Sequence, residues 1–236
     1  MNMKTPQIKF RFNSRFDFEV AWNFYNNQEY GGVNFWKRGA LQYHDKLNTF
    51  EKNKNKKTFL LNYIIEFYRQ HKNEFKYQKE EIKKVYKDKE KEFFYEAEKI
   101  FKNHSWPKGK YVAYLSIFDF CPRFLNDKTF FIFIHDNNKN ILFTIFHEML
   151  HFIFYDYCLT KYPKIFKSQN TENGCFWEIA ELFNAVIQQA PIFEKLHGSI
   201  GNIEYPELRS KFKKAQKAWN GNIDDWITTF GIDYKN

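Results

Sequence analysis

The chain has 236 residues, enough for one large hydrophobic core or two modest ones. Its hydrophobic fraction of 43% and aromatic fraction of 21% exclude an intrinsically disordered chain. The net charge of +9 would suit a nucleic-acid partner, yet only six of the 37 basic residues are arginine, the residue that makes bidentate contacts. We therefore expect that nucleic acid is an unlikely partner.

The cysteines and the apolar segments indicate the compartment. Cys121, Cys158 and Cys175 are odd in number and widely spaced, which favours reduced thiols over a disulfide framework. The first residues contain no apolar segment typical of a signal peptide. The longest apolar run is interrupted by polar residues and is too short to span a membrane. These features predict a cytoplasmic protein without a membrane partner.

The first half of the chain is predicted to be mainly helical. Alternating apolar residues at 8–12 indicate a half-buried strand, and a helix is expected from Asp17 until Tyr30-Gly31-Gly32. Apolar residues at helical spacing predict two further helices, at 56–71 and about 74–103. The lysines and glutamates of the second helix are interpreted as a solvated face, the alternative being a basic docking surface.

The second half is predicted to combine strands and helices. Residues 111–118 and 129–134 have strand-like sequences, and helices are expected at 137–158 and at about 175–189. Pro206 is expected to open another helix. Together these elements predict an α+β fold, mostly helical with a small mixed sheet. We expect one domain over 1–236, with a helical lobe at 1–106 and the functional site within 107–236.

The helix expected at 137–158 contains the sequence His147-Glu148-Met149-Leu150-His151, an H-E-x-x-H motif. In a helix the two histidines point from the same face, and Glu148 lies about 100° from His147. Two neutral imidazoles one turn apart provide half of a zinc site, and the adjacent carboxylate can accept the proton of a zinc-bound water. His147 and His151 are therefore predicted metal ligands, with Glu148 as the catalytic general base.

The residues around the motif are apolar on nearly every side of the helix, as expected for a helix in a core. Burying two imidazoles and a carboxylate there is unfavourable unless each has a partner, and a metal ion provides one. The alternative is a chance match in a solvated helix, but no charged residue lies within three positions of the motif. This pattern favours the metal site.

The motif and its flanks resemble the zincin metalloproteases, in which Val or Thr stands three residues before the first histidine, as Thr144 does here. The resemblance implies a zincin-like fold with a central active-site helix, one zinc ion and a peptide or protein substrate. It also implies that the strand at 129–134 is the sheet edge that aligns substrate. The metzincin branch is excluded, because Phe154 and Tyr157 occupy the positions of its glycine and third histidine.

Zinc needs a third protein ligand. In the gluzincin branch this ligand is a glutamate on a helix some tens of residues after the motif, and Glu181 and Glu178 are the candidates. Glu181 is preferred because it lies nearer the middle of the polar face of the 175–189 helix. Glu178 remains an alternative ligand, and Glu178 or Asn184 could orient a ligand from behind it. The chain lacks the aspartate that follows the glutamate by four residues in well-known gluzincins.

The sequence therefore predicts a zinc-dependent peptidase that hydrolyses peptide bonds with a zinc-activated water and Glu148 as the base. Tyr155, Tyr157 and His197 are candidate donors to the oxyanion. A regulatory or structural zinc-binding domain without protease activity is an alternative. Another is a DNA-associated protease similar to the Spartan family, which takes a third histidine soon after the motif, whereas His197 is the first histidine after His151 here.

Overall fold

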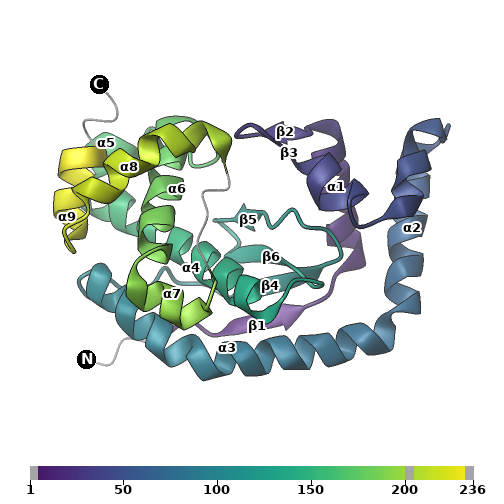
Figure 1. The fold of residues 1–236 in the computed structure, drawn as a ribbon, viewed down its shortest axis with the longest axis horizontal. Helices are drawn as coiled ribbons and strands as arrows, with labels where there is room; N and C mark the ends of the chain where they lie inside the picture. Colours follow the sequence, from purple (N-terminus) through teal and green to yellow (C-terminus); the bar gives the residue numbers. More distant parts are fainter. Residues whose placement is uncertain (1–4, 200–204, 232–236) are drawn as a thin grey trace. The chain divides into compact units, whose positions relative to one another are not determined.

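The structure is a computed structural model that describes residues 5–199 and 205–231. It is mostly helical with a small mixed sheet, which confirms the α+β class (Figure 1). Its contacts group into two compact units. The sheet unit comprises Gln7–Tyr86 and Lys110–Ile141, and the site unit comprises Met1–Pro6, Lys87–Gly109 and Leu142–Asn236. Each unit thus takes segments from both sides of residue 106, where the two predicted lobes meet.

The sheet unit contains four strands in the order β1-β4-β6-β5. The central pair is β4 (Tyr111–Ser116) and β6 (Thr129–Phe133), and β1 (Ile8–Arg11) lies parallel to β4, as β4 does to β6. The short strand β5 (Arg123–Phe124) pairs antiparallel with β6. The expectation that residues 129–134 form the edge strand is therefore wrong, because β5 is the outer strand and pairs with Thr129 and Phe130 of β6.

Helices and a small hairpin complete the sheet unit. These elements are α1 (Ser14–Asn26), β2 (Glu29–Tyr30), β3 (Val33–Asn34), a π-helical turn (Lys37–Leu41), a 3-10 helix (Asp45–Lys52), α2 (Lys56–Gln70) and the first part of α3 (Lys72–Ile100). The helix expected to run until Tyr30-Gly31-Gly32 ends earlier, at Asn26, and the two glycines form the turn of the β2-β3 hairpin. There Gly31 and Gly32 have φ angles of 57° and 78°, which glycine adopts without strain.

A buried carboxylate joins α1 to the end of β4. Asp17 is 1% exposed and accepts hydrogen bonds from Ser116 Oγ at 2.5 Å, Tyr68 Oη at 2.8 Å and Ile117 N at 3.2 Å. Burial raises the pKa of Asp17 from 3.8 to about 6, although all three donors favour its charged form. The polar network therefore fixes the first turn of α1 against the strand while holding an acid that titrates near neutrality.

The site unit is built from helices. It contains the end of α3, α4 (Asn138–Lys161) from Leu142 onward, α5 (Pro163–Phe166), α6 (Gly174–Gln188), α7 (Pro191–His197), a 3-10 turn (Pro206–Leu208), α8 (Arg209–Ala218), α9 (Ile223–Trp226) and a π-helical turn (Ile227–Gly231). The helices expected at 137–158 and 175–189 correspond to α4 and α6. Asn137 caps α4 with its side-chain oxygen, which accepts from the backbone N–H groups of Lys139 and Asn140.

The nearly continuous apolar surface of α4 is explained by its neighbours within the site unit. Phe146 stacks on Phe93 of α3 with ring centroids 4.3 Å apart, and Phe154 stacks on Phe183 of α6 at 4.5 Å. At the C-terminal end of α4, Tyr157 donates a hydrogen bond to Asp224. These contacts join the motif helix to α3, α6 and α9. Over residues 5–199 and 205–231, no helix has the length and hydropathy needed to cross a membrane.

Candidate metal centre

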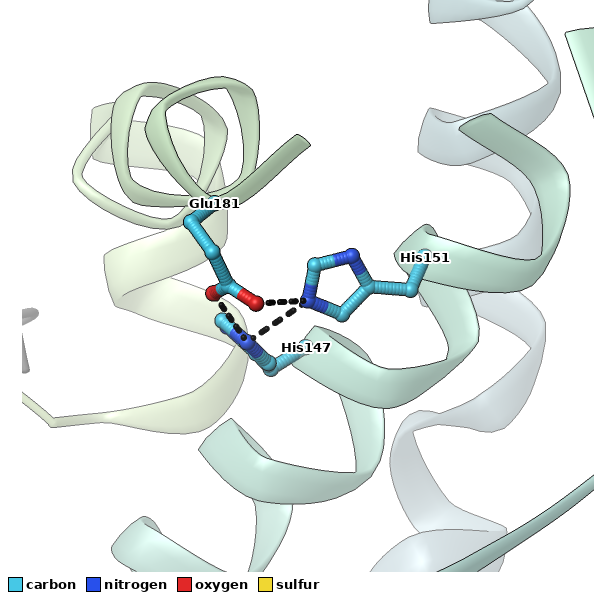
Figure 2. A group of neighbouring side chains, drawn as sticks. All are labelled: His147, His151 and Glu181. Atoms are coloured by element: carbon cyan, nitrogen blue, oxygen red, sulfur yellow. Dashed lines mark hydrogen bonds and ion pairs between the residues drawn. The ribbon is translucent and has the colours of Figure 1, made fainter. Parts of the chain in front are cut away.

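The two histidines of the motif lie one turn apart on α4 and turn their rings toward a common point (Figure 2). Their Nε2 atoms are 3.0 Å apart, and their ring planes are inclined at 81°. This is the arrangement expected from residues i and i+4 of an α-helix. Local helical geometry is therefore sufficient to bring the first two nitrogen donors together.

The third donor comes from α6. Glu181 places Oε2 3.3 Å from His147 Nε2 and Oε1 3.3 Å from His151 Nε2, so its carboxylate spans both rings (Figure 2). The ligand atoms of the three residues all lie within 4.8 Å of one another. They form one group of possible metal ligands in the described part of the chain. The structure thus brings together the two histidines and the glutamate that the sequence analysis groups as ligands.

The donor set fits a zinc ion. Zinc bonds nitrogen and carboxylate oxygen at about 2.0–2.2 Å in tetrahedral sites, so its ligand atoms lie about 3.3–3.5 Å from one another. The two nitrogens are 3.0 Å apart, each lies 3.3 Å from its nearer Glu181 oxygen, and with one ligand atom taken from each residue all three lie within 4.8 Å of one another. Two imidazoles and one carboxylate also match the nitrogen and oxygen ligands that zinc prefers. Three protein ligands leave the fourth tetrahedral position for water or substrate.

The centre is deeply buried and opens at one histidine. The side chain of His151 is 0% exposed and that of Glu181 is 3% exposed, whereas that of His147 is 20% exposed. Glu148 is also buried, at 4% exposure. Polar groups at such burial are costly without partners, and a bound cation would compensate three of them at once. The partly exposed ring of His147 marks the side from which solvent reaches the centre.

Glu178 and Asn184, the two residues expected to orient a ligand, make different contacts. Glu178 lies outside the group of three, and its Oε2 accepts a hydrogen bond from Lys211 Nζ of α8. Asn184 is fully buried, and its Nδ2 donates to the backbone carbonyl of His147, one of the candidate ligand residues, at 3.0 Å. The side chain of Asn184 therefore contacts the backbone of the motif helix.

The three candidate oxyanion donors have other partners. Tyr155 Oη donates to the carbonyl of Thr171 at 2.9 Å, and Tyr157 Oη donates to Asp224 Oδ1 at 2.6 Å. His197 Nε2 donates to the carbonyl of Gln188, while its Nδ1 accepts from the backbone N–H of Ser199. Burial lowers the pKa of His197, which keeps this ring neutral. These partners assign all three side chains to holding the helices in place.

Sequence reasoning left one polar side chain of α6 without a role. Gln188 is fully buried, and its Nε2 donates to the carbonyl of Phe143 at 2.9 Å. The available signal was its spacing, because Gln188 follows Asn184 by four residues and Glu181 by seven and so shares their helix face.

Comparisons of the chain with protein-family models, with curated proteins and with solved structures find no match.

Proposed function

We propose that this chain is a zinc-dependent peptidase in which His147, His151 and Glu181 hold one zinc ion and Glu148 is the general base. The observation that supports the proposal is the convergence of the three side chains: the two Nε2 atoms are 3.0 Å apart, and each lies 3.3 Å from a different oxygen of the Glu181 carboxylate. A solvated helix with a chance match to the motif would not place a buried carboxylate from another helix against both histidines.

The expected chemistry follows from the residues around the centre. A zinc ion in such a site lowers the pKa of a bound water toward about 7 and polarises a substrate carbonyl. Glu148 accepts the proton of the attacking water and delivers it to the leaving amine. Its burial on α4 limits competing contacts with solvent. His147 and His151 act as neutral ligands through Nε2, and substrate approaches from the exposed side of His147.

The burial of the centre favours a second candidate function, a zinc-binding regulatory or structural domain without hydrolysis. Only His147 among the three ligands has appreciable exposure, whereas a peptidase must admit a polypeptide. This function uses the same three ligands and gives Glu148 no catalytic role. A protease similar to the Spartan family is less well supported, because the third donor is Glu181 and His197 has other partners.

The two functions are separated by measuring metal content and hydrolysis on the same preparations. Wild-type protein and Glu148→Gln would be purified without chelator, analysed for zinc and incubated with a mixed peptide library. A peptidase requires one zinc per chain in both proteins and cleavage by the wild type alone. Zinc in both proteins with no cleavage by either would support the regulatory or structural domain, and absence of zinc would contradict both.

A further inference from the structure

Two side-chain amides of α6 bind the backbone of α4. Asn184 Nδ2 donates to the carbonyl of His147 at 3.0 Å, and Gln188 Nε2 donates to the carbonyl of Phe143 at 2.9 Å. Both side chains are 0% exposed. The carbonyls can only accept, so both amides must present their NH2 groups to α4. The pair therefore joins the two helices through directional bonds inside the core.

The two carbonyls belong to the helical turns that carry the histidines. In an α-helix the carbonyl of residue i accepts from the N–H group of residue i+4. The carbonyl of Phe143 is thus the helical partner of the His147 N–H group, and the carbonyl of His147 is the partner of the His151 N–H group. Each amide of α6 therefore binds the backbone carbonyl that is also the helical hydrogen-bond partner of one histidine.

The spacing of the contacts defines how the helices are aligned. Asn184 and Gln188 are four residues apart on α6, and their partners His147 and Phe143 are four residues apart on α4 in the opposite direction. The helices therefore run antiparallel here. A slip of one residue would move α6 by about 1.5 Å and turn its side chains by about 100°. Either change would break both hydrogen bonds and remove Glu181 from the histidines.

Apolar packing alone would hold this alignment less strictly. The stacked rings of Phe154 and Phe183 also join α4 to α6, but the hydrophobic effect is not directional. Metal ligands in contrast must lie within about 0.2 Å of their ideal distances. Glu181 precedes Asn184 by three residues on the same face of α6, so an alignment fixed at Asn184 and Gln188 also fixes Glu181.

The amides are an unfavourable choice for stability alone. The side-chain oxygens of Asn184 and Gln188 are buried and have no hydrogen-bond partner among the residues that the structure describes. A buried acceptor without a partner costs free energy that an apolar side chain of similar volume would avoid. What the amides supply in return is a directional contact with α4, which an apolar side chain lacks.

We infer that Asn184 and Gln188 are positioning residues that fix α6 on α4 and thereby place the carboxylate of Glu181 at the metal. The inference depends on the zinc site of the proposed function but not on peptide hydrolysis. A further hydrogen bond holds the C-terminal end of α6, where His197 Nε2 donates to the backbone carbonyl of Gln188. Loss of either amide should weaken metal binding although neither amide touches the metal.

The test compares variants that remove the NH2 groups at nearly constant volume. Asn184→Leu, Gln188→Met and the double variant would be compared with wild type for zinc affinity by competition with a chelator. We expect each single variant to bind zinc about 10–100-fold more weakly, the usual effect of losing a residue that orients a ligand. Gln189→Met is the matched control, because Gln189 is the next residue, is only partly buried and should leave affinity within about twofold.

Two further measurements separate positioning from stability. The visible spectrum of cobalt(II)-substituted protein reports ligand number and geometry, and it should change in the variants and stay unchanged in Gln189→Met. The melting temperature of the metal-free protein reports folding, and only variants that remain folded are compared, Gln188→Met being the milder substitution. Folded variants with wild-type zinc affinity and an unchanged cobalt spectrum would overturn the positioning role of the two amides but not the zinc site. A wild-type protein that binds no zinc would overturn the zinc site and the inference together.

Discussion

His147 and His151 present their Nε2 atoms to each other at a distance of 3.0 Å. Nitrogens at this distance either share a proton in a hydrogen bond or both face one cation, and each lies 3.3 Å from an oxygen of the Glu181 carboxylate. A cation bound by all three residues would contact both nitrogens and the carboxylate at once. This relationship is the reason to treat the H-E-x-x-H sequence as a metal site, and it leads to the first predictions.

The wild-type protein is expected to bind one zinc ion per chain, as measured by elemental analysis after purification without chelator. His151→Ala should lose the metal because it removes one of three ligands, and it should also lower the melting temperature. The stability loss follows because His151 is fully buried and its removal leaves a cavity beside His147 and Glu181. A chelator should lower the melting temperature of wild type but not of His151→Ala. Wild-type protein without any transition metal would contradict the prediction.

Glu148→Gln is expected to retain zinc and the fold but to lose peptide hydrolysis by at least about 100-fold, the usual contribution of a general base. Glutamine has nearly the same shape as glutamate and cannot accept the proton. Zinc content and melting temperature are measured on the same sample as turnover, so loss of metal cannot be mistaken for loss of the base. Turnover equal to wild type would show that Glu148 is not the base.

Glu181→Ala is expected to weaken zinc binding far more than Glu178→Ala. Glu181 contributes a carboxylate at the two histidines, whereas Glu178 pairs with Lys211 in a partly exposed position. Such surface pairs contribute little to stability, so Glu178→Ala should remain folded and provide a control of the same chemical type on the same helix. Chelator competition measures both affinities. Equal losses in the two variants would contradict the assignment of Glu181 as the third ligand.

The long elements of the fold were predictable because their periodicity is local. The helices expected at 56–71 and 175–189 occur as α2 and α6, each within one residue at either end. Short elements were missed because tertiary contacts stabilise them. The two residues of β5 carry no alternation pattern, yet they pair with β6. The edge position expected for residues 129–134 came from the resemblance to the zincins, and β5 takes that place beside the first residues of β6.

In the candidate site, too, the sequence predicts what depends on local helical geometry and not what depends on the packing of two helices. The positions of His147 and His151 follow from one turn of one helix, which sequence alone specifies. The choice between Glu178 and Glu181 depends on how α6 is rotated against α4, and the two residues lie on the same polar face. Contacts with other helices distinguish them: Lys211, 33 residues beyond Glu178, pairs with Glu178, and the amides of Asn184 and Gln188 bind the backbone of α4 on the side of Glu181.

Asp17 provides a prediction that does not involve the metal. Its pKa is raised from 3.8 to about 6 by burial, so between these values the folded chain binds more protons than the unfolded chain. The free energy of unfolding should therefore fall as the pH rises through this window, and the loss is complete above about pH 6. The change in pKa corresponds to about 3 kcal/mol.

Asp17→Asn removes this titration, so its unfolding free energy relative to wild type should increase by about 3 kcal/mol as the pH rises from below 4 to above 6. The difference between the two proteins is measured by denaturant titration at several pH values, which cancels the titration of all other groups. Glu19→Gln, which removes an exposed carboxylate from the same helix, is the matched control. A difference that stays constant with pH would show that the donors Ser116, Tyr68 and Ile117 offset the burial of Asp17, and one that shrinks as the pH rises would show that they outweigh it.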